Sequence, residues 1–382
     1  MKKRFFKARK FSAIFLSAAL ITGSFAGNLA LSAEQTAAGT ADDPIIISTA
    51  DELRSMVSSG GNGQYYKLAN DIAVNDTNAD NWYEQENLTQ WLYSSWWDNS
   101  FYGTIDGDGH TITGLYNNLT NASGGTMYCG FIPFLSEYGP TVIRNLKIDK
   151  SYFRISDEQE VSVGAFVGNE GGRNLTLTSC AVGKDVTINC ESSSGNQIIG
   201  GFVGALGGGL DTLTITDCIS ELVNVSTTTN GSIWVGSLFG HGWGTQISAN
   251  NVLSTGLKLK GNDSAEYNAV INGGFTTVNL EDTIGEKAKT TLTGFDFDLA
   301  CTWATIENGY PTLSIFNGQT EKGTAENPIM ITTASELKRM VESGGNGKYY
   351  KLTNDIAVND TSADNWYEQE NLTQWIYTVN GN

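Results

Sequence analysis

The sequence is poor in histidine and cysteine, and both shortages exclude familiar kinds of site. Its two histidines, His110 and His241, cannot form the His-Glu-x-x-His motif that places two zinc ligands on one helix face. Its five cysteines form no Cys-x-x-Cys pair, and an odd number cannot all be paired in disulfides. We therefore expect no metal site, and we expect the cysteines to be small buried apolar residues.

Positive charge is also scarce. The 23 Lys and Arg residues face 41 Asp and Glu residues, a net charge of −18. Six of the cations lie within residues 2–10, so the chain without them carries 17 − 41 = −24. Such an acidic surface repels phosphate groups, which excludes nucleic acid and anionic membranes as partners.

The first 33 residues have the layout of a secretory signal peptide. Six cations precede the apolar stretch 11–21, and small residues follow it. Cleavage after Ala26 and cleavage after Ala33 both fit, and a retained anchor is the alternative. No later stretch is apolar enough for a membrane-spanning helix, so we expect no membrane insertion after cleavage. The predicted location is secreted, extracellular or at the cell surface.

A short glycine motif repeats through the middle of the chain. Val-Gly-Ala-Phe-Val-Gly at 163–168 recurs at 199–204 and 235–240, a spacing of 200 − 164 = 36 and 236 − 200 = 36 residues. Period-2 strand patterns follow each copy. Stacking of the copies would align three columns of side chains, namely Val163/Ile199/Val235, Phe166/Phe202/Leu238 and Cys180/Cys218/Asn251.

These repeats predict an all-β chain folded as a right-handed parallel β-helix, with a β-sandwich or a propeller as the alternative. The recurrent glycines would supply either a positive φ at corners or room where one coil presses on the next.

A longer repeat divides the chain. Residues 323–377 match residues 39–93 at an offset of 284, with 43 of 55 positions identical. In the first copy, Thr49 and Glu52 form a capping box that predicts a short capping helix over 50–57. We expect a signal peptide at 1–33, a β-helix cassette at 39–316, a linker at 317–322, and at 323–382 a truncated second copy of the cassette N-terminus. The alternative is that this second copy caps the far end of the same solenoid.

The glycine core, together with Phe101-x-Gly-x-Ile-Asp-Gly-x-Gly-His-Thr-Ile and the closing Gly309-Tyr-Pro-Thr-Leu, resembles the GLUG-motif repeat family of exported bacterial surface proteins. The resemblance covers 39–316 and restarts at 323, but it departs at 75–100, where an aromatic insert lies. It implies a right-handed parallel β-helix at a cell surface, of adhesin-like type, and no particular activity.

Catalytic signals are incomplete. Gly240-His241-Gly242 matches the Gly-His-Gly of polygalacturonases, but the carboxylates that such enzymes need are not evident. Arg144 and Arg173 are candidate lyase bases without a clear acidic cluster beside them. Asp106-Gly-Asp-Gly resembles half of a Ca²⁺ loop, but a tight turn between two strands is the better interpretation. We predict no catalytic residues and no cofactor.

An aromatic cluster is the candidate binding site. Aromatic faces stack on sugar rings, and exposed apolar patches mark binding sites. The tentative ligand-binding residues are Trp82, Trp91, Trp96, Trp97 and Tyr102. The alternative is that these rings plug the first coils of the solenoid.

Three functions remain open. The first is a non-catalytic secreted or cell-surface module that binds an extracellular glycan or a host or surface protein. The second is a carbohydrate-active β-helix enzyme, either a polysaccharide lyase or a glycosidase. The third is a structural spacer within a larger surface protein.

Overall fold

We analysed a computed structural model of the chain. It describes residues 38–375, apart from gaps at 95–99, 121–124, 157–158, 170, 172–173, 193, 207–211, 222, 243–245, 256, 261–268, 272–274, 277, 318–322, 324, 326, 343–347 and 371. The chain divides into residues 1–37 and residues 38–382. The predicted signal peptide therefore lies outside the described residues, as does most of the predicted linker.

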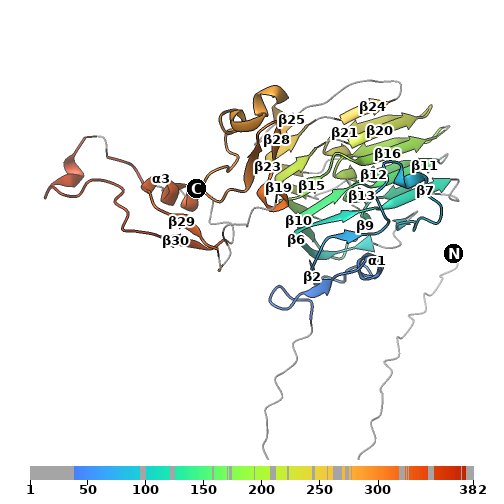
Figure 1. The fold of residues 1–382 in the computed structure, drawn as a ribbon, viewed down its shortest axis with the longest axis horizontal. Helices are drawn as coiled ribbons and strands as arrows, with labels where there is room; N and C mark the ends of the chain where they lie inside the picture. Colours follow the sequence, from blue (N-terminus) through green and yellow to red (C-terminus); the bar gives the residue numbers. More distant parts are fainter. Residues whose placement is uncertain are drawn as a thin grey trace, which may run out of the picture. The chain divides into compact units, whose positions relative to one another are not determined.

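The described chain winds into four β-sheets, in which strands of successive coils pair in parallel except at the two ends of the stack (Figure 1). Sheet A contains β6 (Gly103–Thr113), β10 (Thr141–Asp149), β14 (Leu175–Thr178) with β15 (Ala181–Val182), β19 (Thr212–Ser220) and β23 (Gln246–Ser254). Sheet D contains β7 (Tyr116–Thr120), β11 (Tyr152–Ser156), β16 (Val186–Glu191), β20 (Val223–Thr228) and β24 (Leu257–Lys260).

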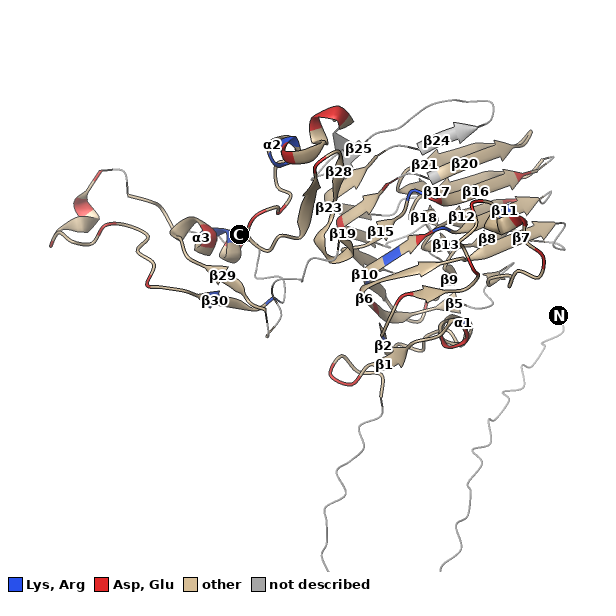
Figure 2. Cartoon of the chain, viewed as in Figure 1, with Lys and Arg blue, Asp and Glu red and all other residues tan. Residues whose placement is uncertain are grey.

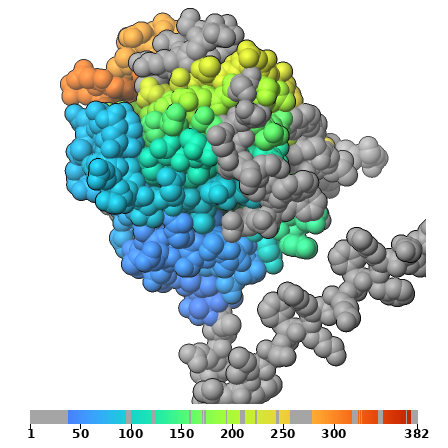
Figure 3. Space-filling view, turned by 90° about the vertical axis from the view of Figure 1, so that its right-hand side faces the viewer, coloured from blue at the N-terminus to red at the C-terminus, as the bar shows by residue number. Residues whose placement is uncertain are grey.

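Two further sheets complete each coil. Sheet B contains β4 (Tyr93–Ser94), β8 (Met127–Cys129), β12 (Val161–Gly164), β17 (Gln197–Gly200) and β21 (Ile233–Gly236). Sheet C contains β5 (Ser100–Phe101), β9 (Ile132–Leu135), β13 (Val167–Asn169), β18 (Val203–Leu206) and β22 (Phe239–Gly242). Each coil adds one strand to every sheet, so successive coils appear as successive colour bands in Figure 3. The predicted parallel β-helix is confirmed.

Two of the three predicted columns are present as expected. Val163 pairs with Ile199, which pairs with Val235. The rings of Phe166 and Phe202 lie 5.2 Å apart, and the Phe202 amide donates to the carbonyl of Leu238. Because like residues stack at one strand spacing, the 36-residue period is the length of one coil.

The third column is wrong at its last member. The Cys180 amide lies 3.4 Å from the sulfur of Cys218, but Cys218 is paired with Val252 and not with Asn251. Asn251 has a φ of 52° and so occupies the left-handed region. The pairing of β19 with β23 keeps one offset of 34 residues on both sides of this place, so Asn251 is the equivalent of Asp217, whose φ is 49°.

The same kink recurs on every coil of sheet A. Its positions are Asp108, Asn145, Ser179, Asp217 and Asn251, all with φ between 49° and 54°. Asn and Asp tolerate this conformation better than most residues. The predicted tight turn between two strands at Asp106–Gly109 is therefore wrong, since β6 runs unbroken through 103–113 with a kink at Asp108.

The repeated glycines provide room and not a positive φ. A β-carbon on Gly204 would lie 2.5 Å from the Gly168 carbonyl oxygen, 2.6 Å from Ser162 Oγ and 2.7 Å from the Val163 nitrogen. These neighbours belong to the preceding coil, so sheets B and C pack backbone against backbone. Only glycine fits this close approach.

Apolar side chains fill the interior of the coils. One inward column contains Ile105, Ile143, Leu177, Ile215 and Ala249, all of which are at most 7% exposed. Four cysteines are buried and Cys301 is half-buried, so the expectation of buried apolar cysteines is confirmed for four of the five. Acidic residues lie mainly on turns, loops and helices (Figure 2).

A cap covers the first coil. It contains β1 (Ile45–Ile47), α1 (Ala50–Ser58), β2 (Tyr65–Leu68), β3 (Ile72–Ala73) and the 3₁₀ turn η1 (Trp82–Glu84). The capping box of Thr49 and Glu52 is present, as predicted. Strand β2 pairs in parallel with β1 on one side and with β6 on the other, so the cap extends sheet A.

The remaining elements follow β24. They are β25 (Ala269–Ile271), β26 (Phe275–Thr276), η2 (Leu280–Thr283), η3 (Gly285–Lys287), α2 (Ala288–Thr291), β27 (Trp303–Ile306), β28 (Gly309–Leu313) and η4 (Ser314–Phe316). The second copy of the cap contains β29 (Ile329–Ile331), α3 (Ala334–Glu342), β30 (Tyr350–Leu352) and η5 (Trp366–Glu368). In the described part of the chain, no helix is long and apolar enough to cross a membrane.

Candidate ligand-binding groove

The structure separates the aromatic residues that the sequence grouped together. Trp91 is 2% exposed, and its Nε1 donates to the Phe131 carbonyl at 2.9 Å, with the Arg54 guanidinium over its ring. Tyr102 packs edge-on against Tyr138 in the turns that join sheets C and A. Buried Trp91 offers no face to a ligand and belongs to the core, which was the alternative interpretation. Trp96 and Trp97 lie outside the described residues.

Trp82 lies beside a groove, where it is buried and holds the neighbouring residues in place. Trp82 is 5% exposed and packs edge-on against Tyr116 at 6.0 Å between ring centroids. This burial fixes η1, so that the next residue, Tyr83, reaches sheet D. There its ring stacks on Tyr152 at 4.3 Å with an interplanar angle of 3°.

The other tyrosines come from the repeat itself. Tyr152 opens β11 and is paired with Tyr116 of β7 on one side and with Thr187 of β16 on the other. Tyr116 and Tyr152 are 152 − 116 = 36 residues apart, and their rings lie 6.0 Å apart at 18°. The 36-residue period could have identified this pair. The contact with Tyr83 could not be found that way, because it depends on the path of the insert.

The groove beside these rings has a volume of about 300 Å³. Trp82, Tyr83 and Tyr152 supply its aromatic lining. The remaining lining carries hydroxyl, amide, carboxylate and ammonium groups, from Thr77, Asn78, Asp80, Lys150, Ser151, Asp185, Thr187 and Asn224, together with Ala79. A few polar groups around an aromatic wall fix the orientation of a bound small molecule.

The hydroxyl of Tyr152 is a hydrogen-bond donor at neutral pH. Burial is the main cause that raises its pKa, although the Asn189 amide and Arg154 oppose the rise. Asn189 Nδ2 donates to the Tyr152 oxygen at 3.1 Å, which leaves the tyrosine proton available to an acceptor on a ligand. Next to it, Arg154 is held between Asn118 at 3.1 Å and Glu191 at 2.9 Å. The outer face of sheet D is thus polar and ordered beside the groove.

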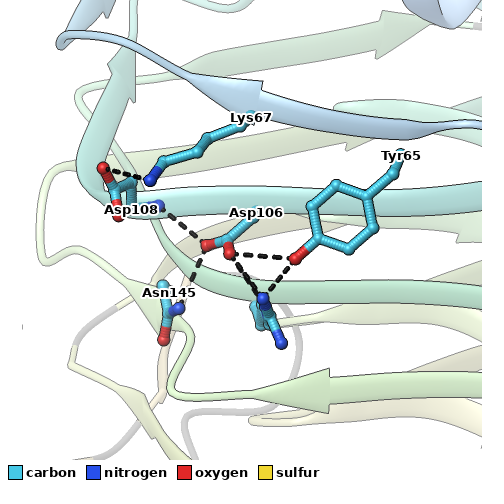
Figure 4. Close-up of polar contacts among 6 residues, drawn as sticks. Tyr65, Lys67, Asp106, Asp108 and Asn145 are labelled. Atoms are coloured by element: carbon cyan, nitrogen blue, oxygen red, sulfur yellow. Dashed lines mark hydrogen bonds and ion pairs between the residues drawn. The ribbon is translucent and has the colours of Figure 1, made fainter. Parts of the chain in front are cut away.

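A second polar cluster, on sheet A, joins the cap to the solenoid (Figure 4). Asp106 is 6% exposed and accepts from Tyr65 at 3.1 Å, from Arg144 Nε at 2.9 Å and from Asn145 at 3.0 Å. The backbone amide of Asp108 donates to Asp106 Oδ1 at 3.0 Å. The sequence showed no clear acidic cluster beside Arg144, and the structure places Asp106 there.

The charged groups of this cluster hold the fold together and do not serve a reaction. Burial raises the pKa of Asp106, but Arg144 and the hydrogen bonds from Asn145 and Asp108 outweigh it and lower the pKa overall. Burial and the charge of Asp106 raise the pKa of Tyr65 to about 12, against the opposing effect of Arg144. The guanidinium is engaged by Asp106 and by the Tyr65 oxygen, so it is not poised to take a proton from a substrate.

The other candidates have neighbours of their own. His241 stacks on Trp234 at 5.1 Å, and His110 lies 3.2 Å from Asp71. Arg173 lies outside the described residues. Among the residues that the structure describes, no group of three or more His, Cys, Asp or Glu side chains could hold a metal ion.

Comparisons with known proteins give distant relatives only. No family model matches the chain, so the GLUG-motif family stays a resemblance. A protein of Evansella cellulosilytica described as a Gly-rich membrane protein is 29% identical over 137 residues, which are 35% of this chain and 14% of that protein. Halomucin of Haloquadratum walsbyi is 28% identical over 167 residues, 44% of this chain and 2% of that protein. The matches thus span only small parts of these relatives.

Among solved structures, a crystal structure from Bacteroides ovatus described as an immunoglobulin A1 protease is similar, at 18% identity and a TM-score of 0.37. The alignment covers 72% of this chain and 94% of that one. A similarity this low carries no argument about function.

Proposed function

We propose that this chain is a secreted or cell-surface β-helix module that binds an extracellular glycan in the groove on sheet D, without catalysis. The observation that carries the proposal is the stacked pair of Tyr83 and Tyr152 beside hydroxyl, amide and carboxylate groups. Sugar rings present apolar C–H faces to aromatic rings and hydroxyls to polar side chains. The names of the two distant relatives, a membrane protein and halomucin, are consistent with a place at the surface.

A glycan array probed with the full mature chain tests the proposal, followed by calorimetry on any hit. Tyr83→Ala and Tyr152→Ala should each weaken binding about tenfold, since an aromatic contact contributes about 0.5–1.5 kcal/mol beyond its buried area. The duplication supplies a matched control. Tyr367 corresponds to Tyr83 (367 − 83 = 284), is 64% exposed and contacts Trp366.

Tyr367→Ala should leave glycan binding unchanged. Equal loss in the Tyr83 and Tyr367 variants would place the binding surface elsewhere. Absence of any glycan ligand, with capture of a protein partner instead, would favour the protein-binding alternative.

One observation supports the alternative that the chain is an enzyme: Asp80 and Asp185 line the same groove. Glycosidases use two carboxylates, whose different environments assign one as acid and the other as base or nucleophile. Both of these residues are exposed, and this similarity argues for binding over hydrolysis. Release of reducing ends or unsaturated products from pectin, alginate or glycosaminoglycans, abolished by Asp185→Asn, would establish an enzyme.

A further inference from the structure

The second copy of the cap folds like the first. Strands β29 and β30 pair in parallel, as β1 and β2 do. Thr333 and Glu336 repeat the capping box, with the Glu336 amide donating to Thr333 Oγ1 at 3.2 Å and the carboxylate accepting from the Thr333 amide at 3.0 Å. The two caps can therefore be compared residue by residue at the offset of 284.

Their apolar faces differ in exposure. Side chains that the first cap buries are open in the second, as shown by Leu68 at 0% against Leu352 at 55%, Val57 at 0% against Val341 at 43%, and Trp91 at 2% against Trp375 at 39%. A pair outside this face differs little, with Ile46 at 51% and Met330 at 46%. The large differences are therefore at apolar residues that the first cap buries.

The first cap shows what covers this surface. Strand β6 lies along β2, and the Thr104 amide donates to the Gln64 carbonyl at 2.9 Å. Lys67 pairs with Asp108 at 3.0 Å, and Tyr65 donates to Asp106. The strand contributes inward Ile105 and Ile112, which are fully buried. The natural complement of the cap is thus an extended, acidic strand with two inward isoleucines.

The second cap has the same residues that contact this strand in the first cap. Tyr349 and Lys351 correspond to Tyr65 and Lys67, and Leu352 corresponds to Leu68. On its other side β29 is covered, since Ile329 and Ile331 are fully buried against Leu299 and Ala300. In the described residues, β30 is paired with β29 alone, so its outer edge and the apolar face beneath it form an open strand-binding surface.

We infer that this surface binds, by strand addition to β30, the first strand of a β-solenoid turn that carries the pattern of residues 101–112, Phe-x-Gly-x-Ile-Asp-Gly-x-Gly-x-x-Ile. Backbone hydrogen bonds along the edge provide affinity, and pockets for alternate side chains provide specificity. Tyr349 and Lys351 complement carboxylates at the positions of Asp106 and Asp108. This inference is independent of the glycan groove, which lies on sheet D.

The test is binding of a fluorescein-labelled peptide, residues 100–116, to the full chain, followed by anisotropy. The first cap is occupied by its own β6, so the second cap is the expected site. Leu352→Asp should weaken binding at least about tenfold, because it places a charge where a leucine becomes buried. Met330→Asp is the matched control and should leave binding unchanged, since Met330 and its counterpart Ile46 in the first cap are both exposed.

A peptide with Ile105→Asp and Ile112→Asp should not bind. Hydrogen exchange of residues 350–352 should slow in the presence of the unmodified peptide. The inference is overturned if the folded chain shows no saturable binding up to about 1 mM peptide, a concentration that corresponds to only about 4 kcal/mol of binding free energy. Equal binding by the Leu352 and Met330 variants also overturns it. So does self-association of the chain that Leu352→Asp abolishes and the peptide does not compete, because a different face of a second copy would then be the partner.

Discussion

Replacement of Gly204 by alanine tests why the glycine motif repeats. The new methyl group would lie 2.5–2.7 Å from Gly168, Ser162 and Val163, and two of these three contacts are with backbone atoms. Backbone cannot rotate away as a side chain can, so neighbouring coils must separate. Overpacking of a dense interior costs about 1–3 kcal/mol, and we expect the upper end of this range.

Gly242→Ala is the matched control. It lies two residues after the repeated Gly240, and among the described residues its β-carbon would meet only the Leu206 side chain, at 3.5 and 3.7 Å. These are ordinary contacts, so the free energy of unfolding should change by less than about 0.5 kcal/mol.

Urea denaturation followed by tryptophan fluorescence measures the difference. With a slope of about 3 kcal/mol per molar urea, a cost of about 3 kcal/mol lowers the midpoint of Gly204→Ala by about 1 M. Hydrogen exchange should quicken in β13 and β18, since solenoid coils depend on their direct neighbours. Equal midpoints for the two variants would refute the close-packing explanation of the repeat.

Three other substitutions or modifications test the caps and the core. Asp106→Asn should lower the free energy of unfolding more at pH 7 than at acid pH. Burial raises the pKa of Asp106, but Arg144 and the hydrogen bonds lower it below its ordinary 3.8 in the folded state, so the stabilisation is present above that value and is lost as pH falls through the lower folded-state pKa. A loss that does not change with pH would contradict this. Trp91→Ala should cost about 3–5 kcal/mol, whereas its counterpart Trp375→Ala should cost little, as judged by thermal unfolding. Maleimide should label Cys301 alone in the native chain and all five thiols in denaturant, because burial blocks access to the other four; mass spectrometry counts the adducts, and rapid native labelling of a second cysteine would show that the coils open.

The sequence predicted the stacking of the coils well, because residues that recur at one spacing become neighbours on successive coils. The Val163 and Phe166 columns follow directly from a constant spacing. Asn251 was assigned to the wrong column because Asp217 and Asn251 are the equivalent left-handed residues, and the partner of Cys218 is the next residue, Val252. Alternation patterns do not reveal such a kink.

The candidate site was only half accessible to sequence reasoning. Trp82 was among the predicted residues and Tyr83 follows it directly, but Tyr152 lies 69 residues after Tyr83 and meets it only through the path of the insert. Trp91 belonged to the same cluster and became core, because proximity along the chain does not determine which way a ring points. The duplication carries more information, since 43 of 55 identical positions show what the second cap would bury.

The register between β12 and β17 has a consequence for the evolution of this chain. Val163 precedes Gly164 as Ile199 precedes Gly200, and the two pairs occupy equivalent rungs. Excision of residues 164–199 would join Val163 to Gly200 and leave every remaining ladder in register. A whole rung can thus be lost or gained by one unequal recombination, and each event shifts the downstream coils by about 4.8 Å along the stack. The length of the solenoid can therefore change in steps of one coil.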